Sequence, residues 1–149
     1  MKNVTLISII LIGNIICGTT IHIPQDYPTI QEGLNTANQL DTVLVDAGLY
    51  VENITWPYTN GIKLIGSGEE DCIIDGNQNG SVIRFEEDLG GIIDSTTLIT
   101  GFTIQNGAAT EGGGMRLWQS SPTLTGVTFS DNFASSDGGG MYSFQSNPT

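Results

Sequence analysis

Aromatic and arginine side chains recur in the last third of the chain at a spacing that could form a binding surface. Arg116 and Trp118 are followed 26 residues later by Tyr142 and Phe144. Sugars stack on flat aromatic faces, and exposed aromatic side chains are enriched at binding sites. We therefore interpret these four residues as a candidate carbohydrate-binding site.

A second recurring pair is acidic. Glu111 and Asp137 each precede a run of three glycines, again 26 residues apart. Such residues should occupy equivalent corners of neighbouring repeats, and carboxylates about 5 Å apart repel one another unless they splay apart or share a cation. We predict a shared divalent-cation site, with Ca²⁺ as the candidate ion. Carboxylates splayed into water are the alternative.

Other residues give no recognisable catalytic constellation. His22 is the only histidine, and the sequence places no cysteine or serine partner for it, so a nucleophilic triad is unsupported. P-loop, CxxC and HExxH motifs are absent. The acidic clusters at 69–75 and 86–94 fit no known Ca²⁺-loop pattern, so solvated corner loops are the alternative to ion binding. Whether the protein is an enzyme stays open.

A repeated structural unit must position these side chains. Residues 112–115 (Gly-Gly-Gly-Met) return at 138–141, and residues 120–123 (Ser-Ser-Pro-Thr) return as Ser-Asn-Pro-Thr at 146–149. A fixed period of this length is typical of a solenoid, in which each unit buries its apolar face only against its neighbours. The second copy is not followed by the strand that follows the first, so we expect a longer protein, truncated here at its C-terminal end.

Alternation along the repeats predicts which residues face the interior. Met115 should point inward, and Arg116 should point outward. Neighbouring coils lie about 4.8 Å apart, the spacing of paired strands. This spacing should stack Arg116 against Tyr142, and Trp118 against Phe144.

Only one segment has a helical pattern. Thr29 and Glu32 have the spacing of a capping box, and Ile30, Leu34 and Ala37 fall on one helical face. We predict an amphipathic helix over residues 29–40 that caps the first coil. The chain from 42 to 149 should form the coils, because short strands alternate there with Gly, Asn, Asp and Ser turns.

The N-terminus and the charge indicate a compartment. Residues 1–18 are predicted to be a secretory signal peptide, with Lys2, an apolar core and Gly18 at the cleavage point. An uncleaved anchor is the alternative. Cleavage would leave residues 19–149, with no membrane-inserted segment and with Cys72 as the sole cysteine, which we expect to pack in the core. The net charge of −12 argues against nucleic acid and anionic membranes as partners.

Four segments together resemble the opening of right-handed parallel β-helix proteins. They are IPQDYPTIQEGL at 23–34, DTVLV at 41–45, GLYVENI at 48–54 and IKLIGSG at 62–68. This is the pectin lyase-like superfamily, which includes the N-terminal cap and first coils of pectin methylesterases. The two repeated motifs also resemble those of large bacterial cell-surface β-helix proteins. The resemblance covers about residues 21–149, and it implies a right-handed parallel β-helix in a secreted or cell-surface bacterial protein.

Two classes of function follow from this resemblance. The first is a non-catalytic protein that binds extracellular polysaccharide or acts as an adhesin-like structural module. The second is the N-terminal portion of a carbohydrate-active enzyme, a polysaccharide lyase, pectinesterase or glycosidase, with its active site downstream of residue 149. The family's catalytic residues lie mostly on later coils, and none can be matched here residue by residue.

Overall fold

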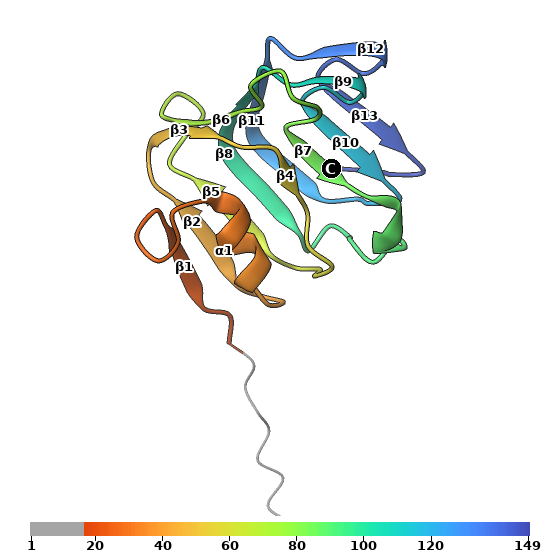
Figure 1. The fold of residues 1–149 in the computed structure, drawn as a ribbon. Coiled ribbons are helices and arrows are strands. Elements are labelled where there is room, and N and C mark those ends of the chain that lie inside the picture. Colours follow the sequence, from red (N-terminus) through yellow and green to blue (C-terminus); the bar gives the residue numbers. More distant parts are fainter. Residues whose placement is uncertain (1–16) are drawn as a thin grey trace, which may run out of the picture.

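The chain winds into a parallel β-solenoid of about five turns, seen in a computed structural model that describes residues 17–149 (Figure 1). Most of the predicted signal peptide, residues 1–16, lies outside the described residues. Each named strand pairs in parallel with a strand of a neighbouring coil. The predicted parallel β-helix fold is therefore confirmed.

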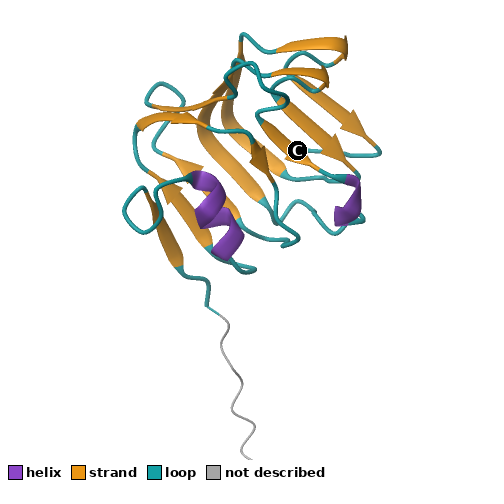
Figure 2. Ribbon diagram, in the orientation of Figure 1, coloured by secondary structure: helices purple, strands orange, loops and turns teal. Residues whose placement is uncertain are grey.

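Within residues 17–149, three sheets form the walls of the solenoid (Figure 2). The largest contains β1 (Thr20–Ile23), β2 (Thr42–Val45), β3 (Gly48–Val51), β5 (Lys63–Gly66), β6 (Cys72–Asp75), β8 (Leu98–Gln105) and β11 (Thr123–Ser130). The second contains β4 (Ile54–Thr55), β7 (Ile83–Phe85), β10 (Met115–Trp118) and β13 (Met141–Phe144). The third pairs β9 (Ala108–Glu111) with β12 (Phe133–Asp137). A 3₁₀ turn, η1 (Glu87–Leu89), follows β7.

The two longest strands each turn a corner of the solenoid. The first half of β8 pairs with β5 and the second half with β6. The bend lies at Gly101 in β8 and at Gly126 in β11, where φ is 77° and 52°. A Cβ atom on Gly101 would lie 2.6 Å from the carbonyl oxygen of Gly66. Glycine is therefore needed at this bend both for its conformation and for its close approach.

Apolar side chains fill the interior by stacking on their counterparts in the next coil. Ile54, Ile83 and Met115 are neighbours in register and are fully buried. The rings of Trp56 and Phe85 stack with their centroids 4.9 Å apart. This interior supplies the hydrophobic free energy that holds one coil to the next.

Two residues that could have been reactive have structural positions. His22 lies in β1, at the edge of the largest sheet. Cys72 is a free cysteine and is fully buried, so its predicted packing role is confirmed. Burial raises the pKa of the Cys72 thiol, which disfavours the reactive thiolate.

The capping helix α1 is shorter than predicted, running over Ile30–Thr36 instead of 29–40. Thr29 is its N-cap and accepts a hydrogen bond from the Glu32 amide. The two oxygens of the Glu52 carboxylate each accept one amide, those of Ile30 and Gln31, at 3.0 Å. The buried face of α1 contacts β1, β2 and β4, so the helix covers the first coil as expected (Figure 1). Among the described residues, no helix is long and apolar enough to cross a membrane.

Asp41 explains why the helix stops early. Its carboxylate accepts the Asn38 amide at 2.7 Å, an amide that a longer helix would have used internally. The other oxygen accepts the Thr19 amide, also at 2.7 Å. Asp41 is 5% exposed. The Thr19 amide, and then the Asn38 amide, hold the pKa of Asp41 below its usual range.

We predict that Asp41→Asn lowers the free energy of unfolding at pH 7 by about 1–3 kcal/mol, because an amide cannot accept from all these donors. The pKa of Asp41 is lower in the folded state than in the unfolded chain, so the carboxylate stabilises the protein above about pH 4. That stabilisation is lost as the pH falls through the folded pKa. Urea unfolding measured between pH 7 and pH 2 should therefore show that the free energy of unfolding falls less on acidification for the variant than for the wild type. Equal losses would contradict this role, and exposed Glu70→Gln is the control.

Replacement of Phe85 by alanine tests the interior stacking. Phe85 is fully buried against Trp56, so Phe85→Ala should lower the free energy of unfolding by about 3–5 kcal/mol. Tyr58 is 66% exposed, and Tyr58→Ala should change the free energy of unfolding by less than about 0.5 kcal/mol. Urea denaturation followed by circular dichroism measures both, and similar stabilities for the two variants would refute this account of the interior.

Candidate functional site

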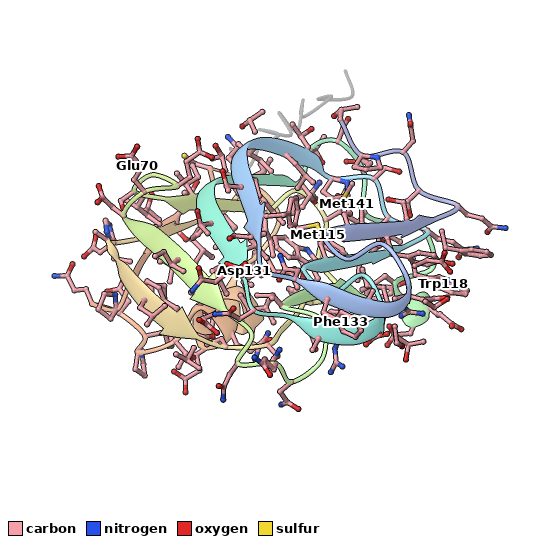
Figure 3. All side chains as sticks on the ribbon, turned by 90° about the horizontal axis from the view of Figure 1, so that it is seen from above. Glu70, Met115, Trp118, Asp131, Phe133 and Met141 are labelled. Atoms are coloured by element: carbon pink, nitrogen blue, oxygen red, sulfur yellow. The ribbon has the colours of Figure 1, made fainter. Side chains whose placement is uncertain are left out.

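The four-stranded sheet positions the predicted carbohydrate-binding residues by alternation. In β10, Met115 and Leu117 are fully buried, whereas Arg116 and Trp118 are half-buried on the outer side. Figure 3 shows the same contrast, with Met115 turned into the solenoid and Trp118 turned out. The predicted orientation of this strand is confirmed.

The register of β10 with β13 is also as predicted. Arg116 pairs with Tyr142, and Trp118 pairs with Phe144. The Trp118 and Phe144 rings are stacked, with centroids 4.2 Å apart and an interplanar angle of 26°. The structure thus brings together all four residues that the sequence analysis proposed for this site.

The stacking changes which aromatic surface could contact a ligand. The guanidinium carbon of Arg116 lies over the Trp118 ring, 5.0 Å from its centroid. A 4.2 Å separation between the rings leaves no room for this group, so it must cover the face of Trp118 away from Phe144. Both faces of Trp118 are therefore covered within the protein. The outward edges of the two rings are what the site offers to a ligand.

One coil below, β7 and the residue that follows it add Arg84 and Glu86, which the sequence analysis did not assign to the site. Arg84 is the register partner of Arg116, so two guanidinium groups lie side by side on adjacent strands. Glu86 lies between them and binds both. One carboxylate oxygen is 3.0 Å from Nε of Arg84, and the other is 3.3 Å from Nη1 of Arg116. Glu86 thereby relieves the repulsion between two like charges.

Two further contacts complete this ion-pair network. Nε of Arg84 also donates to the Thr55 hydroxyl at 2.9 Å. Nε of Arg116 lies 3.8 Å from a carboxylate oxygen of Glu111. We call the outer surface formed by Arg84, Glu86, Arg116, Trp118, Tyr142 and Phe144 the arginine–aromatic face.

An open cavity of about 400 Å³ adjoins the arginine–aromatic face. Its walls combine polar backbone and side chains from β7, β9, β10 and the segment before β7. The lining residues are Gly80, Ser81, Arg84, Glu86, Ala109, Thr110, Glu111 and Arg116. The cavity is thus lined by guanidinium donors and carboxylate acceptors, which suits a small polar ligand group.

Sequence reasoning missed Arg84 and Glu86 because the repeat loses its period below residue 98. Arg84 and Arg116 are 32 residues apart, not 26. The difference lies in the longer connection after β7, which contains η1. The alternating strand around Arg84 was the available signal, but without the repeat nothing linked it to β10.

The predicted acidic pair does lie on adjacent coils, since Glu111 and Asp137 are register partners in β9 and β12. The two carboxylates have different neighbours, because Glu111 faces Arg116 while Asp137 accepts the Ser136 hydroxyl at 2.7 Å. The described residues contain no group of three or more His, Cys, Asp or Glu that could hold a metal ion. A Ca²⁺ ion bound by this pair would therefore need most of its six to eight oxygens from backbone and water.

Two other acidic residues singled out at the corners, Asp75 and Asp94, accept hydrogen bonds from neighbouring side chains and amides. The Asp75 carboxylate accepts from the side-chain amides of Gln105 and Asn106 at 2.9 and 2.7 Å. The Gln105 hydrogen bond is the main cause of its lowered pKa. Asp94 accepts hydrogen bonds from Thr96, which lower its pKa in the same way. The Asp75 contacts join adjacent coils and the Asp94 contact shapes a turn, so both carboxylates have a structural role.

No protein-family model, curated protein or solved structure matches this chain. The interpretation of the site therefore rests on the fold and on the arginine–aromatic face.

Calcium titration tests the acidic pair. If Glu111 and Asp137 share a cation, Glu111→Gln should weaken Ca²⁺ binding at least tenfold, because it removes one of two anionic ligands. Isothermal titration of the wild type and the variant measures this difference, with Glu70→Gln as the matched control. Unchanged Ca²⁺ affinity, or no Ca²⁺ binding by the wild type, would remove the hypothesis.

Proposed function

We propose that this protein is a secreted or cell-surface β-helix protein that binds extracellular polysaccharide through the arginine–aromatic face, without catalysing a reaction. The observation that carries the proposal is the convergence of the Trp118–Phe144 stack and both arginines of the chain on one sheet face, beside an open cavity. Apolar ring surface beside fixed donors and acceptors is the combination that a sugar needs, since sugars have C–H faces and hydroxyl edges.

The fold supports this proposal through its rigidity. The site is built on the regular strands β7, β10 and β13, and in β7 and β10 the alternate side chains are buried in the solenoid interior. A ligand-binding surface on regular strands needs little reorganisation, which lowers the entropic cost of binding. A flat row of coils also suits an extended polymer, because adjacent sugar units can contact adjacent strands.

Resemblance to the pectin lyase-like superfamily and to bacterial cell-surface β-helix proteins supports the proposed compartment and the class of ligand. The same resemblance underlies the enzyme alternative, because one fold hosts many activities. The cavity carboxylates favour the binding role. Glu86 is held between two guanidinium groups, and Glu111 faces one of them, so both are arranged to orient a ligand.

Affinity electrophoresis tests the proposal. The protein should be retarded in native gels cast with at least one extracellular polysaccharide. Phe144→Ala should weaken that binding at least tenfold, because Phe144 supplies part of the ring surface and supports Trp118. Trp118→Ala should have a similar effect.

Tyr58→Ala is the matched control, because Tyr58 is an exposed aromatic residue outside the arginine–aromatic face. Circular dichroism should show that all three variants are folded. Retardation by no polysaccharide, or equal retardation of the wild type and Phe144→Ala, would refute the proposed function.

A further inference from the structure

The charges around the cavity sum to zero. Each arginine already faces a carboxylate: Arg84 faces Glu86 at 3.0 Å, and Arg116 faces Glu86 at 3.3 Å and Glu111 at 3.8 Å. Two positive and two negative side chains therefore line one cavity. An anionic ligand would find no uncompensated positive charge there.

The rest of the protein adds a repulsive field for anions. The chain has 16 acidic and 4 basic residues, a net charge of −12. The two arginines are half of the basic residues, and both are used in the ion-pair network. A polyanion would approach against this field, and the repulsion would act over about 8 Å at physiological ionic strength.

The same network suits uncharged hydroxyl groups. A hydroxyl both donates and accepts, whereas guanidinium only donates and carboxylate only accepts. Neighbouring hydroxyls of a sugar can thus bridge an arginine and a glutamate without displacing either. The side chain of Arg84 is 49% exposed and is held through Nε, which leaves its terminal amino groups to donate to such a ligand. A sugar carboxylate would instead have to displace Glu86 or face it.

From these three observations we infer that the arginine–aromatic face and its cavity bind a neutral polysaccharide and discriminate against polyuronates and sulfated polysaccharides. This inference rests on the proposed function and specifies its ligand class. In the complex, one neutral sugar unit of the polymer contacts Phe144, while the hydroxyl groups of a neighbouring unit reach the Arg84–Glu86–Arg116 network. Glu86 and Glu111 act as specificity determinants, since their charges cancel those of the arginines.

Native gels containing one polysaccharide each test this inference. The neutral set is hydroxyethyl cellulose, mixed-linkage β-glucan and galactomannan, and the anionic set is polygalacturonate, alginate and dextran sulfate. We expect retardation by at least one neutral polymer, at similar strength in about 20 and 500 mM salt, and none by the anionic set. Retardation only by anionic polymers, lost at high salt, would overturn the inference and leave the proposed function standing. Retardation by none of the six would overturn both.

A charge variant tests the assigned role of the two glutamates. Glu86→Gln combined with Glu111→Gln leaves two uncompensated arginines in the cavity. This variant should gain retardation by polygalacturonate and should bind the neutral polymer at least fivefold more weakly. The double variant Glu70→Gln with Asp131→Asn makes the same net-charge change on exposed side chains away from the site (Figure 3). An equal gain in that control, or no gain in the first variant, would overturn the role of the cavity charges.

Discussion

Hydrogen bonding between equivalent strands of successive coils is the constraint on which the rest of this structure depends. The strands pair in register, so each side chain lies one strand spacing from its counterpart. Inside the solenoid this repetition is favourable, because Ile54, Ile83 and Met115 bury one another without any polar atom to satisfy. On the outer surface, the same repetition brings like charges together, and their repulsion has to be compensated.

The arginine–aromatic face follows from that compensation. Register places Arg84 beside Arg116, and Glu86 divides its two oxygens between them. Register also places Trp118 beneath Phe144, where Arg116 covers the remaining face of the indole ring. A polar, charge-balanced cavity beside an apolar ring is thus produced by the repeat itself together with one well-placed glutamate. The binding function that we propose uses side chains whose positions the coils already determine.

The sequence predicts this architecture well wherever the repeat is regular. The 26-residue offset was enough to pair Trp118 with Phe144, because both strands follow equivalent Gly-Gly-Gly runs at that same offset. The prediction was wrong about the end of α1, because the residue that ends the helix, Asp41, is held by Thr19 from a different segment of the chain. Arg84 and Glu86 were missed because the longer connection containing η1 interrupts the period. Local patterns therefore predicted the helix and the strands, whereas contacts between distant segments determined where α1 ends and which residues lie beside Arg116.

The coil built from β11, β12 and β13 is the least buried part of the described chain. Its Phe133 and Met141 are 63% and 37% exposed, although Met141 stacks on the fully buried Met115 (Figure 3). In a solenoid, stability is a sum over the interfaces between neighbouring coils. Tyr142 and Phe144 belong to this coil, while Arg84 and Arg116 lie on the better-buried coils below. A ligand that contacts both groups would therefore bridge three consecutive coils, and part of its binding free energy would stabilise the interfaces between those coils.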